Sequence, residues 1–393
     1  MTSVVECKKC LYTSDHPYGI TFDDNGICSG CAYYEEKFNY NWKEKKESLL
    51  RLVKKYKSKK SNNDCIIHVD GTAQSFYIVH LVKNILEMNP ILVNYNSQFN
   101  TDIGIKNIAK LITKFDTNYY QLTTKTKDYK IAIKHSLQKL QNIYWPYLAG
   151  RSSLAYRLSI KKKIPLVING AIQTNEQVGM FSHDDNIEFS RWYRMEHDLG
   201  GYDENSFISA SDTISDKFFE DISYPNDNEL IKNGTKGIFL GNYFKWDPTF
   251  QNMQMLKFGF TPQRNFTSFD SFENAGCSVY FGIHDILRYF KCNHIKAREH
   301  LSREIRFNRV KKDFAKKIYH RYLQNLNLTD YNLFFEWLDV SSDSKDWLAK
   351  YFLNIKKILR SKRTHHKILL INDKYYSKSV LPKEYFKIFG KGI

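Results

Sequence analysis

Two pairs of cysteines near the start of the chain have the residue types and spacing of a metal site. Cys7 and Cys10 form one C-x-x-C pair, Cys28 and Cys31 form a second, and 17 residues separate the pairs. Two such knuckles place four thiolates tetrahedrally around Zn²⁺. Because no ligand position is left for water, the sequence predicts a structural zinc ion. Four free or regulatory thiols are the alternative.

The other three cysteines, Cys65, Cys277 and Cys292, are interpreted as small buried apolar residues. Two C-x-x-C pairs in a chain of seven cysteines do not form a disulfide framework, which indicates a reducing compartment. The first residues lack the apolar region of a signal peptide, and no stretch approaches the roughly 20 apolar residues of a membrane span. We therefore expect a cytoplasmic protein without a membrane span.

A second candidate site is the loop 69–75, Val-Asp-Gly-Thr-Ala-Gln-Ser, which follows a compact apolar run and precedes a helical pattern. Backbone N–H groups and the helix dipole at such a turn form an anion site that suits a phosphate. The motif contains one glycine and one serine, so an ordinary strand-to-helix turn stays open as the alternative.

Alternating strands and helices are expected to position this loop. By apolar runs and helical periodicity, the predicted elements are strands at 64–69, 91–95 and 164–168 and helices at 42–60, 75–88, 102–115 and 150–163. This alternation implies a parallel sheet that binds ligands at the carboxyl ends of its strands. Gly170 and Glu176, after the third strand, are ligand candidates. A plain strand end and a solvated helix are the alternatives.

The pattern becomes helical after about residue 240, with helices at 284–290 and along a basic amphipathic stretch at 295–323. Four charged or titratable residues of that stretch indicate either a solvated face or a surface for a sugar carboxylate or a partner: Lys296, Glu299, His300 and Arg306. We predict a zinc-knuckle segment at 1–45, an α/β domain at 46–240 and a mainly helical domain at 241–393.

The formal net charge of +17 is compatible with a nucleic-acid partner. The lysines are nevertheless spread along the chain, and runs such as 54–60, 161–163 and 356–367 are typical of solvated helix faces. Anionic nucleotides or sugar acids explain the charge equally well. We therefore expect no nucleic-acid partner.

The order of zinc knuckles, helix, glycine loop and α/β domain resembles that of the N-acetyl sugar amidotransferases of bacterial surface-glycan biosynthesis, a branch of the PP-loop ATP pyrophosphatases. The resemblance covers nearly the whole chain. It is carried by Cys7-Lys-Lys-Cys10, Ile20-Thr-Phe-Asp23-Asp-Asn-Gly26-Ile-Cys28, Phe99-Asn100, Asn107-Ile108, the segment from Gly170 to Glu176, Tyr243-Phe-Lys-Trp246, Phe272-Glu273-Asn274-Ala-Gly-Cys277, Gly282-Ile-His284-Asp285, and the tract from Lys296 through Glu299-His300 to Ser302 and Ile305-Arg306.

The resemblance implies a PP-loop (HUP-like) doubly wound parallel sheet with a helical C-terminal region. It implies a reaction in which ATP adenylates the amide oxygen of an acetamido sugar, pyrophosphate leaves, and ammonia displaces AMP to give an acetamidino group. The substrate would be a nucleotide-linked or acidic sugar such as pseudaminic acid, used for flagellin glycans or lipopolysaccharide. A separate glutaminase, with a cyclase-like subunit, would supply the ammonia.

The resemblance also assigns residues to the site, without naming a catalytic nucleophile. ATP with Mg²⁺ would lie beside Asp70, Gly71, Thr72, Ser75, Gly170 and Glu176. The substrate or a partner would lie beside Lys296, Glu299, His300 and Arg306. Zn²⁺ would be held by Cys7, Cys10, Cys28 and Cys31.

The loop is a degenerate form of the family pattern Ser-Gly-Gly-x-Asp-Ser. Gly71 and Ser75 match, whereas Asp70, Thr72 and Gln74 replace Ser, Gly and Asp. A carboxylate ~4 Å from a phosphate charge is repelled by about 4 kcal/mol at an effective dielectric constant of roughly 20. Three hypotheses stay open: an active amidotransferase, a catalytically degenerate binding or scaffold subunit, and a tRNA-modifying PP-loop enzyme.

Overall fold

The computed structural model of this protein describes residues 4–58, 63–140, 142–205, 214–263, 267–273, 279–324 and 331–340. Some predictions concern other residues: the segment from Asn274 to Cys277, the lysine run at 356–367 and the end of the run at 54–60 lie outside the described part. The side chain of Cys292 lies outside it as well. The predictions for these residues stay predictions.

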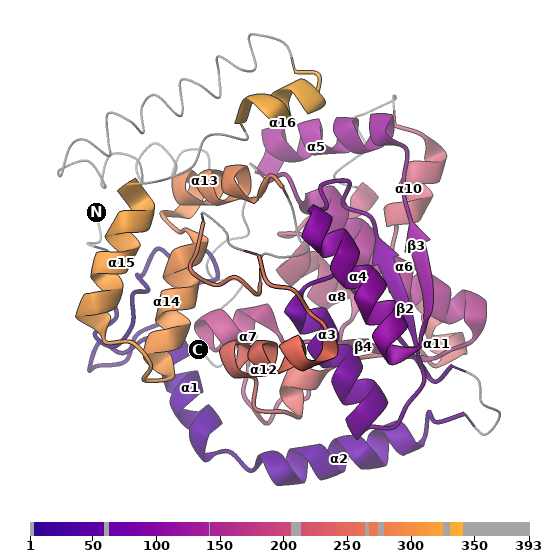
Figure 1. The fold of residues 1–393 in the computed structure, drawn as a ribbon, viewed down its shortest axis with the longest axis horizontal. Helices are drawn as coiled ribbons and strands as arrows, with labels where there is room; N and C mark the ends of the chain where they lie inside the picture. The colour runs from indigo at the N-terminus through magenta and orange to yellow at the C-terminus, as the bar shows by residue number, and fades with distance from the viewer. Residues whose placement is uncertain are drawn as a thin grey trace.

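A parallel sheet of five strands lies at the centre of the described chain (Figure 1). The strands are β1 Cys65–His68, β2 Pro90–Tyr95, β3 Asn118–Leu122, β4 Leu166–Asn169 and β5 Lys236–Phe239. Their order is β3-β2-β1-β4-β5, and each neighbouring pair is parallel. The chain adds β2 and β3 on one side of β1 and then β4 and β5 on the other, which confirms the predicted doubly wound sheet.

The two faces of the sheet belong to separate cores because successive side chains of a strand point to opposite faces. Ile66 and Val93 pack on the face covered by α6 (Trp145–Lys162). Ile67 and Leu92 pack on the opposite face with α3 (Ala73–His80) and α4 (Asp102–Phe115). Cys65 is fully buried on this second face, as predicted.

Helices surround the sheet and connect its strands. Their bounds are α1 Ser29–Asn39, α2 Trp42–Lys54, α3 Ala73–His80, α4 Asp102–Phe115, α5 Thr126–Leu140, α6 Trp145–Lys162, α7 Gln173–Val178, α8 Arg191–Tyr193, α10 Asp216–Ile222, α11 Asp227–Asn233, α12 Pro248–Gln254, α13 Phe281–Cys292, α14 Lys296–Arg306, α15 Lys312–Gln324 and α16 Tyr331–Trp337. Within the described ranges, no helix has the length and apolar character needed to cross a bilayer.

Two strands have no counterpart among the predicted elements. β3 lies at the edge of the sheet and most of its residues are exposed or half-buried, so it carries no apolar run. β5 has four residues, of which one is lysine and one is glycine. An uninterrupted apolar run identifies a strand that is buried on both faces, and neither of these segments contains such a run.

The amphipathic stretch at 295–323 is two helices rather than one. α14 ends at Arg306 and α15 begins at Lys312, because the chain turns at Asn308, whose φ is +57°. Asparagine is one of the few residues that adopt this left-handed conformation readily. The turn lets α15 fold back against α14, and both helices lie beside the N-terminal segment (Figure 1).

The N-terminal knuckle shares a core with the rest of the protein. Cys7, Cys10, Leu11 and Tyr12 belong to the same buried cluster as residues of the sheet, α14 and α15. A metal site in this segment therefore lies between the N-terminus and the C-terminal helices.

Candidate functional site

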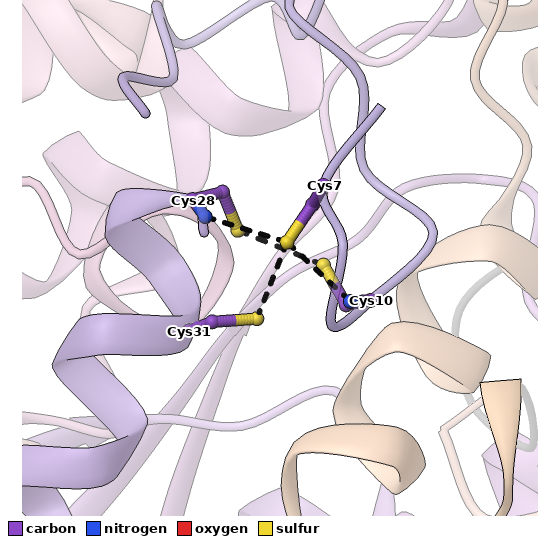
Figure 2. Close-up of side chains that lie close together, drawn as sticks. All are labelled: Cys7, Cys10, Cys28 and Cys31. Carbon is purple, nitrogen blue, oxygen red and sulfur yellow. Dashed lines mark hydrogen bonds between the residues drawn. The ribbon is translucent and has the colours of Figure 1, made fainter. Parts of the chain in front are cut away.

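The four predicted zinc ligands converge on one point (Figure 2). The sulfur atoms of Cys7 and Cys31 are 3.9 Å apart, and those of Cys10 and Cys28 are 3.6 Å apart. A tetrahedron with Zn–S bonds of about 2.3 Å has edges of about 3.8 Å. The spacing therefore fits a single tetrahedral ion such as Zn²⁺.

Backbone groups around Cys7 favour its thiolate form. The amide nitrogens of Lys9, Cys10 and Cys28 lie 3.3, 3.4 and 3.3 Å from Cys7 Sγ and donate hydrogen bonds to it. All four cysteines are fully buried. Regulatory thiols need access to solvent, so this geometry favours the metal site over the alternative of free thiols.

The strand-end loop adopts a conformation that requires glycine at its second position. Gly71 has a φ of +74°, and a Cβ atom there would lie 2.5 Å from the carbonyl oxygen of Gly104 in α4. Thr72 then caps α3, because its side chain accepts a hydrogen bond from the Ser75 amide. Gly71 thus brings the loop directly against the start of α4.

The carboxylate of Asp70 is bound inside this loop. Its Oδ1 atom accepts hydrogen bonds from the Thr72 amide at 3.2 Å, the Thr72 hydroxyl at 2.7 Å and the Ser75 hydroxyl at 2.9 Å. Within the described residues, Oδ2 accepts none. Donors that would otherwise be available to a bound anion are therefore directed at the protein's own carboxylate.

Gly170 lies across from this loop, at the carboxyl end of β4. A Cβ atom on Gly170 would approach Gln74 Nε2 to 2.4 Å, so the absence of a side chain lets the two segments meet. The order of the sheet reverses between β1 and β4, and ligands of doubly wound sheets bind at such a switch point. The structure thus brings five predicted residues together: Asp70, Gly71, Thr72, Ser75 and Gly170.

Glu176 makes a different set of contacts. Lys37 Nζ lies 2.7 Å from both carboxylate oxygens, and the Tyr34 hydroxyl donates to Oε2 at 2.8 Å. Burial lowers the pKa of Lys37, and the Glu176 carboxylate opposes that shift. The carboxylate of Glu176 therefore joins α7 to α1.

The predicted substrate residues of α14 lie in the interior. Glu299, His300 and Arg306 are buried and Lys296 is mostly so, which means that the solvated-face alternative is wrong. Arg306 lies apart from the other three, under the knuckle, where NH2 is 3.6 Å from Cys28 Sγ. Lys296 and Glu299 form an ion pair at 3.2 Å, and Arg288 also contacts Glu299.

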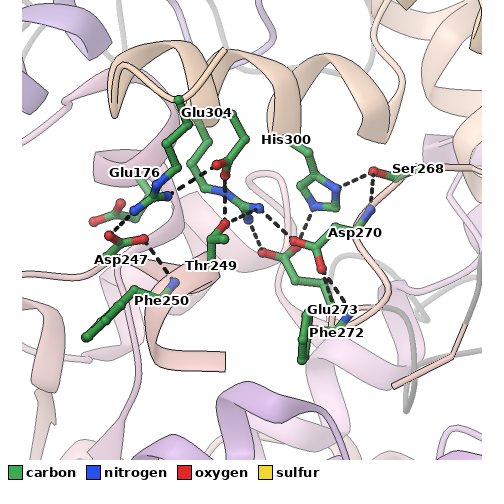
Figure 3. A network of polar contacts seen from close by, with 12 residues as sticks. Glu176, Asp247, Thr249, Phe250, Ser268, Asp270, Phe272, Glu273, His300 and Glu304 are labelled. Atoms are coloured by element: carbon green, nitrogen blue, oxygen red, sulfur yellow. Dashed lines mark hydrogen bonds and ion pairs between the residues drawn. The ribbon is translucent and has the colours of Figure 1, made fainter. Parts of the chain in front are cut away.

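A buried ionic network connects α14 to the segment 268–273 (Figure 3). Arg303 pairs with Asp270 at 2.6 Å and with Glu273 at 2.7 Å. His300 lies between Ser268, 2.5 Å from Nδ1, and Glu273, 2.7 Å from Nε2. Lys296 reaches the same Glu273 oxygen at 3.2 Å.

Asp270, Glu273 and His300 bring ligand atoms within 4.8 Å of one another, as a metal site would. Arg303 and Lys296 already neutralise the two carboxylates. A divalent cation would have to displace both cations from a buried site, so we interpret the cluster as a closed ionic network.

Asp270, Arg303 and Lys37 are buried charged residues that sequence reasoning missed. For Arg303 a signal exists, because charged residues recur every three or four positions along α14 and must share faces of the helix. For Lys37 and Asp270, whose partners are distant in the chain, the sequence contains no comparable pattern.

Replacing Arg303 by methionine should destabilise the protein by about 3–5 kcal/mol, because Asp270 and Glu273 would stay buried without their guanidinium partner. Urea unfolding measures the loss. Arg51→Met, at an exposed position of α2, is the matched control and should change stability by less than about 0.5 kcal/mol. Equal losses in the two variants would contradict the network.

The lowered pKa of Glu299 predicts that the free energy of unfolding depends on pH. Burial raises its pKa, but Arg288 and Lys296 outweigh burial and hold the pKa of Glu299 at about 2 instead of 4.5. The resulting stabilisation, roughly 3 kcal/mol, is complete above about pH 4.5 and is lost as the pH falls toward 2. In urea unfolding, the advantage of the unaltered protein over Glu299→Gln should shrink between pH 5 and pH 3. A constant difference would refute this.

Comparisons with known proteins find distant structural similarity only. No protein-family model and no curated protein matches the chain. An NH3-dependent NAD synthetase from Campylobacter jejuni is 15% identical with a TM-score of 0.27, covering 57% of this chain and 99% of that chain. The U34-tRNA thiolase NcsA from Methanococcus maripaludis, solved with its [4Fe-4S] cluster, is 13% identical with a TM-score of 0.27. The match covers 80% of this chain and 89% of that chain.

An NMN synthetase from Francisella tularensis is 11% identical with a TM-score of 0.23, covering 69% of this chain and 94% of that chain. Identities and TM-scores this low assign no activity to the present chain. A functional assignment therefore depends on its own residues.

Proposed function

We propose that this protein is an ATP-dependent N-acetyl sugar amidotransferase that converts an acetamido group to an acetamidino group with ammonia from a partner glutaminase. The observation that supports the proposal best is the position of loop 69–75. The loop ends the central strand β1 at the switch point of the sheet, with Gly170 opposite.

The proposed reaction requires the loop to position ATP and to stabilise negative charge, and it requires no nucleophile from the loop. In this proposal, the Thr72 amide and the Thr72 and Ser75 hydroxyls turn from Asp70 toward the phosphates of ATP. Asp70 then offers its carboxylate to Mg²⁺, whose preferred ligands are oxygen atoms. Gly71 and Gly170 let α4 and Gln74 pack closely against the two strand ends because neither glycine carries a side chain, and this packing fixes the position of the loop.

Oxygen-isotope transfer tests this proposal directly. The purified protein is incubated with ATP, Mg²⁺, ammonium and an acetamido sugar labelled with ¹⁸O at the amide carbonyl. Adenylation at that oxygen, followed by displacement with ammonia, must leave the label in AMP. Mass spectrometry should therefore detect labelled AMP in step with amidine formation. Absence of AMP and pyrophosphate with a panel of acetamido sugars would refute the active-enzyme proposal.

A second candidate function, a catalytically degenerate binding or scaffold subunit, is favoured by the hydrogen bonds of Asp70. If the loop donors stay bound to Asp70, ATP has no access to them. Calorimetry with ATP and Mg²⁺ separates the two functions. Binding in the micromolar to low millimolar range would refute the degenerate subunit.

A tRNA-modifying enzyme is the third candidate, and the chain's net charge of +17 is the observation that favours it. Cys65, the one cysteine outside the knuckle whose side chain is described, lies buried within β1, and burial raises its thiol pKa. It is therefore a poor sulfur-transfer residue. Binding to tRNA that weakens steeply with salt would support this candidate.

A further inference from the structure

We propose that Arg306 is a positioning residue that couples metal binding at the knuckle to α7, the helix that follows β4 and Gly170. A metal ion bound at the knuckle would then stabilise the carboxyl edge of the sheet as well as the N-terminal segment. The inference depends on the proposed function only in treating that edge as the ligand-binding edge.

The guanidinium of Arg306 lies between the thiolates and α7. NH2 is 3.8 Å from Cys10 Sγ and 3.6 Å from Cys28 Sγ, and NH1 donates to the carbonyl oxygen of Glu176 at 3.0 Å. The ring centroids of Tyr12 and Tyr34 lie 4.7 and 5.2 Å from the guanidinium carbon. One planar side chain thus contacts two metal ligands and the backbone of α7.

Charge balance gives Arg306 a reason to be buried. Four thiolates around one Zn²⁺ carry a net negative charge, and a charge in the interior must be paired. Arg306 is 1% exposed, and its contacts place a permanent positive charge beside two of the sulfur atoms. Loss of the metal or of a ligand would therefore disturb the partner that fixes Arg306.

The close packing of α1 on α7 supports the coupling. A Cβ atom on Gly30 would lie 2.3 Å from Arg306 NH2 and 2.3 Å from the Gln177 carbonyl, so Gly30 opens the space that Arg306 enters. Ser29 donates its hydroxyl proton to the Val178 carbonyl at 2.6 Å. Helix α1, whose N-cap residue is Cys28 and which contains Cys31, is thus in direct contact with α7.

Glu176 is held from two sides. Arg306 binds its backbone carbonyl, while Lys37 of α1 binds its carboxylate and the Trp246 carbonyl at 3.2 Å. α7 is only six residues long and has few bonds of its own to resist fraying. The position of α7 therefore depends on these contacts, and one of them is made by Arg306, which also contacts the cysteines of the metal site.

Arg306→Met and Arg309→Met form a matched pair for testing the proposal. Arg309 follows α14 by one turn and pairs with Glu304 and Asp247, away from the thiolates. In Arg306→Met, zinc transfer to a chromogenic chelator should be about tenfold to a hundredfold faster, because removal of groups that support metal ligands lowers metal affinity by that factor. Arg309→Met should release zinc at the rate of the unaltered protein.

Two further measurements separate coupling from simple destabilisation. In Co²⁺-loaded protein, loss of the guanidinium N–H groups should shift the thiolate-to-cobalt charge-transfer band to longer wavelength, because hydrogen bonds stabilise the sulfur electrons. Hydrogen exchange should become faster at 173–179 in Arg306→Met under excess Zn²⁺, while exchange in β1 and α4 stays unchanged. The control variant should show neither effect.

Arg306→Lys keeps the test decisive if the methionine variant does not fold. An ammonium group keeps the charge but cannot reach both sulfur atoms and the Glu176 carbonyl together, so α7 should lose protection while zinc release accelerates less. Unchanged exchange at α7 together with unchanged zinc release would overturn the proposal. These readouts need neither ATP nor substrate, so failure of the amidotransferase proposal would leave them interpretable.

Discussion

Replacing Asp70 by serine is expected to raise the affinity of this protein for Mg²⁺-free pyrophosphate by roughly tenfold to a thousandfold. The carboxylate of Asp70 binds the Thr72 amide and the hydroxyls of Thr72 and Ser75, which are groups that would otherwise face an anion. Its removal both frees these donors and eliminates a negative charge at the site. Isothermal calorimetry without divalent ions measures the gain.

Two control variants test whether the gain in pyrophosphate affinity comes from the charge of Asp70 and from its place in the loop. Asp70→Asn removes the charge but leaves an amide oxygen that accepts from the same donors, so its gain should be smaller than that of Asp70→Ser. Asp216→Ser makes the same change at an exposed position in the first turn of α10 and should have no effect. Equal pyrophosphate affinities of Asp70→Ser and the unaltered protein would contradict the expectation.

The same variant distinguishes the two leading functions when Mg²⁺ is present. If Asp70 is a Mg²⁺ ligand of an active enzyme, Asp70→Ser should weaken ATP binding with Mg²⁺ and abolish AMP formation. If Asp70 only blocks the loop, the substitution should improve ATP binding with Mg²⁺ as well. The sign of the change in affinity therefore identifies the role of this residue.

Replacing the predicted zinc ligand Cys31 by serine should reduce the metal content from about one ion per chain to nearly none, because serine is a poor zinc ligand at neutral pH. Zinc supplies roughly 10–16 kcal/mol to the folding of small zinc modules, so the N-terminal segment should unfold. Because Cys31 shares a core with α14 and α15, the melting temperature of the whole protein should also fall. Metal analysis and calorimetry measure both effects.

Cys65→Ala is the matched control for this variant. Cys65 is equally buried, but it lies in β1 and outside the metal cluster. It should destabilise the protein modestly and leave the zinc content unchanged. Retention of one zinc ion by Cys31→Ser would contradict a site in which all four thiolates are required.

The central fold could be predicted from the sequence because buried strands appear as apolar runs and amphipathic helices repeat their apolar residues with the helical period. β1, β2, β4 and α4 appear as uninterrupted apolar or amphipathic patterns. The exposed edge strand β3 and the four-residue strand β5 do not, and the break between α14 and α15 depends on a single asparagine in a left-handed conformation. A pattern of apolar residues does not reveal an exposed edge strand, a very short strand or a turn made by one residue.

By itself, the sequence determined where the two candidate sites lie. The spacing of two short motifs identifies the four cysteines of a candidate metal site, and a loop after a buried strand must lie at the carboxyl edge of a parallel sheet. Only the tertiary structure decided which partners the charged residues have. The pairing of Arg303 with Asp270, and of Arg306 with the thiolates, joins residues tens to hundreds of positions apart. Charge pairing between distant segments of a core depends on distance in space, and no sequence spacing encodes it.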